Sequence, residues 1–261
     1  MNEYAPKRLS CTIKPMSDYI DLEISSPWLN AAGTLGFAPG AEGWNWPEMQ
    51  GGFVTNPVSL NPRTPAEARA ALPYPGGCLL HSGLPNPGLK ALLRKFAERW
   101  ARGSLPLWVH LLADAPDEMH RMALALEEVE GVTAIEVGIP PQAGRDLALA
   151  LLEAAVGELA VVAGLPLTAA GEPWLKELPR LGVRGLCLAA PRGTLPGPDG
   201  KLISGRLVGA GLFPQALAAL RSVQPLGLPV VVGSGIFSVA AGRALLSAGA
   251  AAVQLDTVLW L

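Results

Sequence analysis

A glycine-rich turn near the carboxyl end of the chain has the residue types of an anion-binding site. Gly233, Ser234 and Gly235 lie between an apolar strand pattern and a helical pattern. Backbone N–H groups at such a strand-to-helix turn can bind a phosphate. Asp256 follows the next strand pattern, where its carboxylate would repel that phosphate. Asp256 is alternatively expected to cap a helix or to bind Arg206, and the glycine triplet alone is also compatible with an ordinary turn.

Four other ionisable residues are expected near strand ends, namely His81, His110, Glu136 and Arg192. His81 is either a ligand contact or an ordinary loop histidine. His110 lies inside a strand pattern, where we expect a buried histidine bonded to a neighbour rather than a catalyst. A lone inward carboxylate needs a partner. Glu136 is therefore expected to form a structural hydrogen bond or ion pair, with Arg192 as a candidate mate.

Composition limits the classes of partner. The 261 residues include 20 basic and 22 acidic side chains, which gives a net charge of −2. The densest basic run is only Lys7-Arg8, so we expect neither nucleic acid nor an anionic membrane as a partner. Small molecules and other proteins remain as partners.

Cysteine usage and the amino-terminal segment indicate a cytoplasmic protein. Cys11, Cys78 and Cys187 form neither a close pair nor a metal-knuckle spacing, so we expect no disulfide framework and no metal site. The first residues are polar where a signal peptide has its apolar core. The longest uncharged stretch, 222–242, contains prolines and glycines that argue against a membrane-spanning helix.

Short apolar runs alternate with longer amphipathic runs along the chain. The strand patterns lie at 28–33, 52–57, 107–112, 132–138, 159–164, 183–189, 229–233 and 251–255. Helical patterns include 86–100, 115–130 and 144–157. Uninterrupted Val, Ile and Leu runs are typical of parallel strands covered on both faces. Eight such strands favour a single α/β domain over 1–261, a TIM-type (β/α)8 barrel, rather than an open sheet, with the chemistry on the loops after the strands.

Only residues 256–261, which end in Val258-Leu259-Trp260-Leu261, follow the last strand pattern, so the predicted barrel lacks a normal C-terminal eighth helix. The apolar seam left by that helix is expected to be covered. The N-terminal extension at 1–20 or a second subunit would cover it, and the latter predicts a homodimer or another protein partner. A shortened, frayed helix is the alternative.

Six segments in a common order resemble the soluble, FMN-type dihydroorotate dehydrogenases. They are SPWLNAAGTLGF (26–37), GGFVTNPVSLNPRTP (51–65), GCLLHSGLPNPGLKALL (77–93), TAIEVG (133–138), GRLVGAGLFPQALAAL (205–220) and the tail that contains Asp256. The resemblance covers most of residues 20–257. It implies a β/α barrel that holds FMN and oxidises dihydroorotate to orotate in pyrimidine biosynthesis.

The resemblance assigns candidate FMN-binding positions to nine residues, which are Ala31, Ala32, Gly33, Thr55, Asn56, Gly209, Ser234, Gly235 and Thr257. Small residues at 31–33 suit a flat ring lying against backbone. The family's flavin-supporting lysine falls at Asn56, and a family glycine falls at Asp256. The resemblance thus implies FMN as the cofactor, whereas Asn56 and Asp256 oppose its binding. The repulsion between the Asp256 carboxylate and the phosphate costs on the order of a few kcal/mol.

The substrate-handling positions differ from the family pattern. The candidate substrate contacts are His81, Ser82, Gly83 and Leu84, and the family's substrate asparagine just before them is Leu80 here. The family's catalytic base falls at Pro141, in a stretch at 138–142 without a group that can accept a proton. The family's strand-five lysine and strand-six asparagine fall near Ala163 and Ala190.

These differences predict a degenerate member of the family that has lost dihydroorotate oxidation and acts as a non-catalytic or repurposed binding or assembly protein. The alternative is an FMN-dependent oxidoreductase of the dihydroorotate dehydrogenase type, with the flavin held mainly by backbone groups. A third option is a barrel of another kind that binds a sugar phosphate.

Overall fold

The computed structural model describes residues 22, 24–40, 50–67 and 70–260, and its centre is a parallel sheet of eight strands. The strands are β1 (Trp28–Asn30), β2 (Phe53–Val54), β5 (Leu107–Leu111), β6 (Val132–Gly138), β7 (Ala160–Pro166), β8 (Gly185–Ala189), β11 (Val230–Val232) and β12 (Ala252–Leu255). Their order in the sheet is β1-β12-β11-β8-β7-β6-β5-β2. All eight coincide with the predicted strand patterns.

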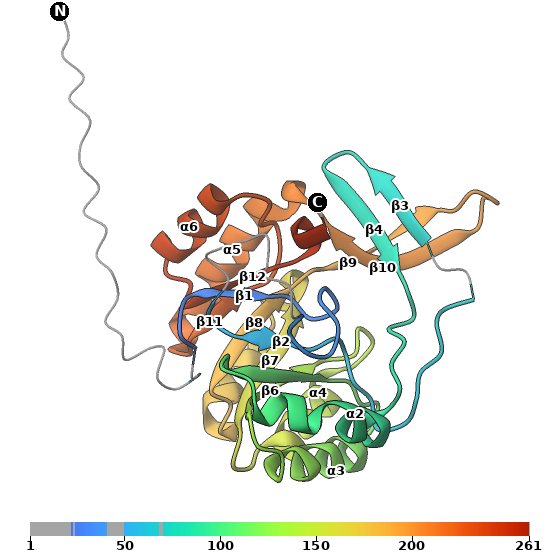
Figure 1. The fold of residues 1–261 in the computed structure, drawn as a ribbon. Coiled ribbons are helices and arrows are strands. Elements are labelled where there is room, and N and C mark those ends of the chain that lie inside the picture. The colour runs from blue at the N-terminus through green and yellow to red at the C-terminus, as the bar shows by residue number, and fades with distance from the viewer. Residues whose placement is uncertain (1–21, 23, 41–49, 68–69, 261) are drawn as a thin grey trace, which may run out of the picture.

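The sheet curls into a nearly closed barrel whose seam lies between β1 and β2 (Figure 1). A parallel bridge joins Leu29 to Gly52 across the seam. The buried side chain of Asn30 adds two bonds, since its Oδ1 accepts from the Val54 N–H at 2.9 Å and its Nδ2 donates to the Val54 carbonyl at 2.7 Å. This amide replaces ladder bonds that the two short strands do not make, and the predicted barrel is confirmed.

Helices cover the outside of the barrel. They are α2 (Leu89–Ala101), α3 (Pro116–Glu127), α4 (Arg145–Ala155), α5 (Phe213–Val223) and α6 (Val239–Ser247), while the 3-10 segments η1 (Leu167–Ala169) and η2 (Pro173–Leu181) lie between β7 and β8. The three predicted helices are confirmed; α3 and α4 are shorter at both ends than predicted, and α2 begins three residues later and ends one residue later. Proline at the start of α3 suits a helix terminus, because its missing N–H would have no partner there.

The barrel interior is filled by side chains that point inward from alternate strand positions. The apolar part consists of Leu29, Val54, Trp108, Ala134, Val162, Cys187, Val231 and Ala252. Leu22 and Ile24, which precede β1, pack against these residues. Gly185 leaves space for Leu22, because a Cβ at residue 185 would lie 3.1 Å from Leu22 Cδ2. The segment before β1 thus closes the amino-terminal end of the barrel.

A four-stranded antiparallel sheet, which the strand patterns of the sequence do not predict, stands outside the barrel at one end (Figure 1). Its strands are β3 (Ala70–Tyr74), β4 (Gly77–His81), β9 (Arg192–Pro196) and β10 (Leu202–Val208), in the order β3-β4-β10-β9. The two hairpins follow β2 and β8, so they leave the carboxyl ends of the barrel strands. His81, expected in a loop, is instead the last residue of β4.

The chain after β12 forms the short 3-10 segment η5 (Thr257–Trp260). No α-helix follows β12 in the part of the tail that the structure describes. The indole N–H of Trp260 donates to the Thr34 carbonyl at 2.9 Å, which fixes this segment to the loop after β1. The extension at 1–20 was expected to cover the apolar surface left by the missing eighth helix, and it lies outside the described residues. No described helix is both long and apolar enough to cross a membrane.

Candidate functional site

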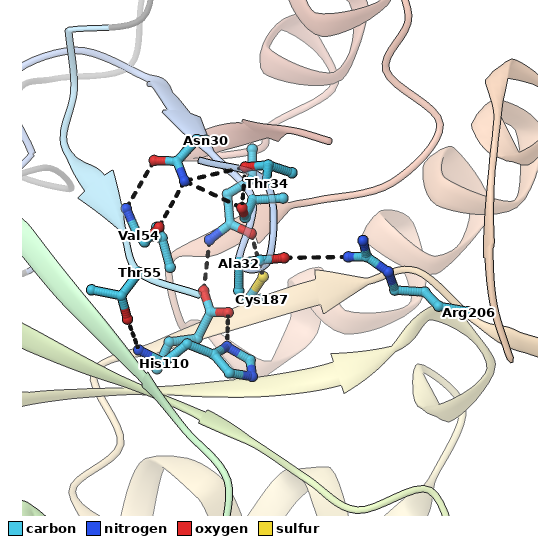
Figure 2. A network of polar contacts seen from close by, with 11 residues as sticks. Asn30, Ala32, Thr34, Val54, Thr55, His110, Cys187 and Arg206 are labelled. Carbon is cyan, nitrogen blue, oxygen red and sulfur yellow. Dashed lines mark hydrogen bonds and ion pairs between the residues drawn. The ribbon is translucent and has the colours of Figure 1, made fainter. Parts of the chain in front are cut away.

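Four polar side chains from four barrel strands form a hydrogen-bonded chain inside the barrel (Figure 2). His110 Nδ1 lies 2.7 Å from Glu136 Oε1. Gln254 Nε2 donates to Glu136 Oε2 at 2.6 Å, and the Cys187 thiol donates to Gln254 Oε1 at 3.3 Å. Glu136 is buried and accepts on both oxygens, so it is the centre of this polar network.

The charge state of Glu136 follows from its partners. Burial alone would raise the pKa of this carboxyl, but the hydrogen bonds from His110 and Gln254 outweigh burial and hold the pKa below its ordinary value. Burial, together with the nearby Glu136 charge, raises the pKa of the Cys187 thiol well above its ordinary value. The network therefore consists of an ionised carboxylate that accepts from His110 Nδ1–H and from Gln254, and of a neutral thiol that donates to Gln254.

The second ring nitrogen of His110 lies at the carboxyl end of the barrel. A Cβ added at Gly138, the last residue of β6, would lie 2.5 Å from His110 Nε2 and 2.8 Å from Leu112 Cδ2. The glycine thus provides the space that the imidazole occupies. The His110 side chain is 12% exposed, whereas that of Glu136 is 2% exposed. The expected bond between His110 and a neighbour is confirmed, and Arg192, on an exposed position of β9, is not the partner of Glu136.

An ion pair from the antiparallel sheet reaches the same end of the barrel. Arg206 of β10 contacts Asp256 Oδ1 at 3.2 Å and donates to the Ala32 carbonyl at 3.3 Å. Figure 2 shows the guanidinium directed toward Ala32. Burial raises the pKa of the Asp256 carboxyl, and Arg206 and the Thr257 N–H partly offset this rise. The predicted pairing of Asp256 with Arg206 is confirmed, and it joins the loops after β1 and β12.

The glycine-rich turn after β11 packs against the start of α5. Gly235 has a φ of 78°, and a Cβ there would lie only 2.6 Å from the Phe213 nitrogen. Both its conformation and this close approach require glycine, with or without a phosphate. Ser234 Oγ and Asp256 Oδ2 are buried without a hydrogen-bond partner among the described residues.

The remaining candidate FMN positions make contacts within the chain. The Ala31 N–H donates to the Leu255 carbonyl at 2.7 Å, and Thr55 Oγ1 accepts from the His110 N–H at 3.1 Å. Asn56 bonds twice to Gly36, through its N–H at 2.7 Å and through Oδ1 at 3.0 Å. Asn56 therefore fastens the loop after β1 to the loop after β2.

Three further candidate FMN positions, Gly209, Thr257 and Gly33, have structural surroundings of their own. Gly209 has a φ of 148°, and a Cβ there would lie 2.2 Å from the Gly76 carbonyl oxygen, so glycine is required by the turn between β3 and β4. Thr257 is buried at the start of η5. Gly33 faces the ion pair, since a Cβ there would lie 4.0 Å from Arg206 Nη2.

The candidate substrate residues after β4 form a turn. Ser82 Oγ accepts from the Leu84 N–H at 3.2 Å, and the Ser82 carbonyl accepts from the Ala66 N–H at 2.9 Å. Gly83 and Leu84 both have positive φ values, 77° and 52°. Pro141 lies exposed between β6 and α4. The structure thus brings His110, Glu136, Arg206 and Asp256 to the carboxyl end of the barrel, whereas Ser82–Leu84 pack on residue 66.

Two residues of the polar network, Cys187 and Gln254, were not among the predicted site residues. Each is a polar residue within an otherwise apolar strand, one in GLCLA and one in AVQL. Because alternate residues of a barrel strand face inward, a polar residue two positions beyond an inward apolar one is expected inside. Gln254 follows the inward Ala252 at this spacing, so the strand period could have found it.

The family models searched give no match to the chain. The catalytic subunit of dihydroorotate dehydrogenase B (NAD(+)) from Desulforudis audaxviator is 28% identical over 258 residues, which is 90% of this chain and 83% of that protein. Its counterpart from Pyrococcus horikoshii is 27% identical over 263 residues, or 92% and 84% of the two chains. The putative dihydroorotate dehydrogenase A (fumarate) of Aeropyrum pernix is 34% identical over 141 residues, or 53% and 45%.

Solved structures support the fold. A FabK variant from Thermotoga maritima superposes with a TM-score of 0.50 at 17% identity, over 94% of this chain and 64% of that one. At this identity the likeness concerns the barrel architecture alone. The sequence matches, by contrast, extend over nearly the whole chain, and over most of its length this protein is a distant homologue of the dihydroorotate dehydrogenase catalytic subunits.

Proposed function

We propose that this dihydroorotate dehydrogenase-like barrel does not hold FMN, does not oxidise dihydroorotate, and acts as a binding or assembly protein. The observation that carries the proposal is the Arg206–Asp256 ion pair. Its guanidinium contacts the Ala32 carbonyl and lies against Gly33. These are positions that the family resemblance gives to the flavin ring.

Binding of a flavin ring at residues 31–33 would require Arg206 to move. Asp256 is buried, and its second oxygen already has no hydrogen-bond partner among the described residues. Removal of the guanidinium would leave a buried carboxylate unpaired, at a cost of about 3–5 kcal/mol by the usual scale for broken buried pairs. The ring therefore competes with an interaction that the protein already makes.

The phosphate end of FMN is opposed by the same residue. Asp256 occupies a position where the family has glycine, and its carboxylate repels a phosphate by on the order of a few kcal/mol at an effective dielectric constant near 20. The residues present thus do not fit FMN at either end of the cofactor.

The proton-handling positions of the family are also changed. Pro141 offers no proton acceptor, and Ala163 and Ala190 are buried apolar residues in place of a lysine and an asparagine. Asn56, in place of the flavin-supporting lysine, is bonded to Gly36. Neither flavin reduction nor removal of the substrate proton has a supporting side chain at these positions.

The visible absorption spectrum of the purified protein tests the proposal. We expect no flavin bands after purification, and none retained after incubation with FMN and gel filtration. We also expect no dihydroorotate-dependent reduction of a dye in the presence of FMN. Retained flavin that is bleached by dihydroorotate would show that the proposal is wrong.

A matched pair of variants tests whether Asp256 is the obstacle. Asp256→Gly restores the family residue and removes the buried charge, and we expect it to retain FMN better than the parent protein. Asp114→Gly removes an exposed carboxylate elsewhere and is expected to leave FMN retention unchanged. Equal retention by both variants would contradict the role given to Asp256.

One observation favours the alternative of an FMN-dependent oxidoreductase. The turn at Gly233–Gly235 keeps a positive φ at Gly235, and the buried Ser234 Oγ has no partner among the described residues. A phosphate could supply that partner. Flavin present in the protein as first isolated would decide for this alternative.

The assembly part of the proposal concerns a homodimer or another protein partner. Sedimentation equilibrium of the full chain measures the subunit number directly. A monomer at all accessible concentrations would leave only the small-molecule or hetero-partner form of the proposal.

A further inference from the structure

The imidazole of His110 has one nitrogen committed and the other open. Both donors to the ionised Glu136 are assigned, because it accepts from His110 Nδ1–H and from Gln254, and Gln254 in turn accepts from the Cys187 thiol. A neutral imidazole carries one N–H and one lone pair. With the proton on Nδ1, the lone pair lies on Nε2, which makes no hydrogen bond within the described residues.

His110 Nε2 lies at the end of the barrel where β/α-barrel enzymes have their catalytic groups. Nε2 is beside Gly138, the last residue of β6, and the side chain retains 12% exposure in an otherwise buried network. Catalytic groups of β/α barrels are at the carboxyl ends of the strands. The position of His110 Nε2 differs from that of the family base. The base position falls at Pro141, which lies three residues after Gly138 and outside β6.

We propose that His110 is a general base that takes a proton from an O–H or N–H group of a small molecule, or from a water, bound at the carboxyl end of the barrel. Nε2 accepts the proton and becomes the second N–H of an imidazolium, while the substrate keeps the electron pair of the broken bond. Glu136 stays ionised and stabilises the new cation at 2.7 Å. Dyads of this kind contribute roughly 10²–10⁴-fold to a rate.

Hydrolysis of 4-nitrophenyl acetate is a suitable probe, because imidazole bases activate water toward this ester. His110 takes a proton from water, the hydroxide oxygen bonds to the acyl carbon, and nitrophenolate leaves with the electrons of the ester bond. The products are acetic acid, which ionises to acetate and a proton, and nitrophenolate, and the imidazolium returns its own proton to solvent. Nitrophenolate release is followed by its absorbance.

We expect His110→Asn to lower the protein-dependent rate at least tenfold. Gly138→Ala keeps both dyad residues but places a methyl group against Nε2, and we expect a similar loss. The matched controls are His120→Asn, an exposed histidine, and Gly171→Ala, where a Cβ meets no atom within 4 Å. Both controls are expected to keep the parent rate.

A spectroscopic measurement covers the case in which His110→Asn does not fold. The imidazole ¹⁵N chemical shifts of the parent protein should report the Nδ1–H tautomer of His110. In Glu136→Gln the new amide can donate to Nδ1, which moves the proton to Nε2, so the tautomer should change and the rate should fall. An unchanged rate in His110→Asn or in Gly138→Ala would overturn the inference.

This inference stands apart from the proposed absence of flavin. The assay uses protein whose spectrum shows no flavin, so failed hydrolysis would contradict only the role of His110. Flavin found in the isolated protein would contradict only the proposed function.

Discussion

Glu136 is a buried charge that three other side chains make tolerable. Its two oxygens accept from His110 and Gln254, and these bonds hold the pKa of the carboxyl below its ordinary value despite burial. A group whose pKa is lower in the folded than in the unfolded state stabilises the fold above the unfolded value. That stability is lost as the pH falls through the folded pKa.

The first prediction concerns Glu136→Gln. The amide cannot accept both bonds, so the free energy of unfolding at pH 7 should fall by about 2–4 kcal/mol. The difference between parent and variant should narrow as the pH falls below about 4.5, the ordinary pKa of the carboxyl. Urea unfolding at neutral and acid pH measures both values. A constant difference would mean that the charge of Glu136 does not contribute.

Asp256 should act with the opposite sign. Burial raises the pKa of this carboxyl despite Arg206, so the folded state binds a proton more readily than the unfolded state. Stability associated with Asp256 should therefore increase as the pH falls through its folded pKa. In Asp256→Asn, urea unfolding should lack this gain, and the acid loss from Glu136 should look steeper than in the parent. A shallower loss would contradict the assignment.

At the scale of the element, a single amide completes the barrel. Asn30 bonds both to the N–H and to the carbonyl of Val54, across the seam where β1 and β2 are too short to pair fully. The Asn30 side chain thus replaces two backbone hydrogen bonds between β1 and β2. Asparagine suits this role because its amide is both donor and acceptor, like a peptide group.

The prediction at this scale is that Asn30→Ala weakens the seam. Two buried backbone groups of Val54 would lose their partners, so the free energy of unfolding should fall by about 2–4 kcal/mol. Hydrogen exchange of the Val54 amide should become faster than that of the other central strands. Asn61→Ala, at an exposed position, is the control and should change neither value. Unchanged exchange at Val54 would contradict the role of Asn30.

The central strands were predictable because they are buried on both faces and consist mostly of apolar residues. The antiparallel sheet was not, since β3 and β9 alternate between exposed and half-buried positions and its strands include residues such as Pro73, Gly193 and Gly205. Proline and glycine argue against strands when the sequence alone is read. Pairing with a distant hairpin overrides that local preference.

The site was predictable in part for the same reason. The strand period places His110 and Glu136 inside the barrel, but their contact depends on the register that sets them opposite each other on β5 and β6. Gln254 reaches Glu136 from β12, which is not a neighbouring strand. Local sequence patterns determine neither the strand register nor the closure of the barrel. Gln254 was therefore not predicted as a partner of Glu136.

At the scale of the whole molecule, the barrel depends on residues outside its strands. Leu22 and Ile24 fill the amino-terminal end, where Leu22 is fully buried against the inner layer. We predict that Leu22→Ala leaves a cavity there and lowers the free energy of unfolding by about 2–4 kcal/mol. Leu124→Ala, whose side chain is 49% exposed, should change it by less than about 0.5 kcal/mol. Equal effects in thermal or urea unfolding would contradict the packing role of Leu22.

The antiparallel sheet has a consequence for the order of folding. β4 pairs with β10 although β5 to β8 lie between them along the chain, so the sheet closes a long loop and forms only when both hairpins have been brought together. Arg206 then meets Ala32 from the beginning of the chain and Asp256 from its end. Because the contacts of Arg206 join three such distant segments, we expect them to form in the last steps of folding.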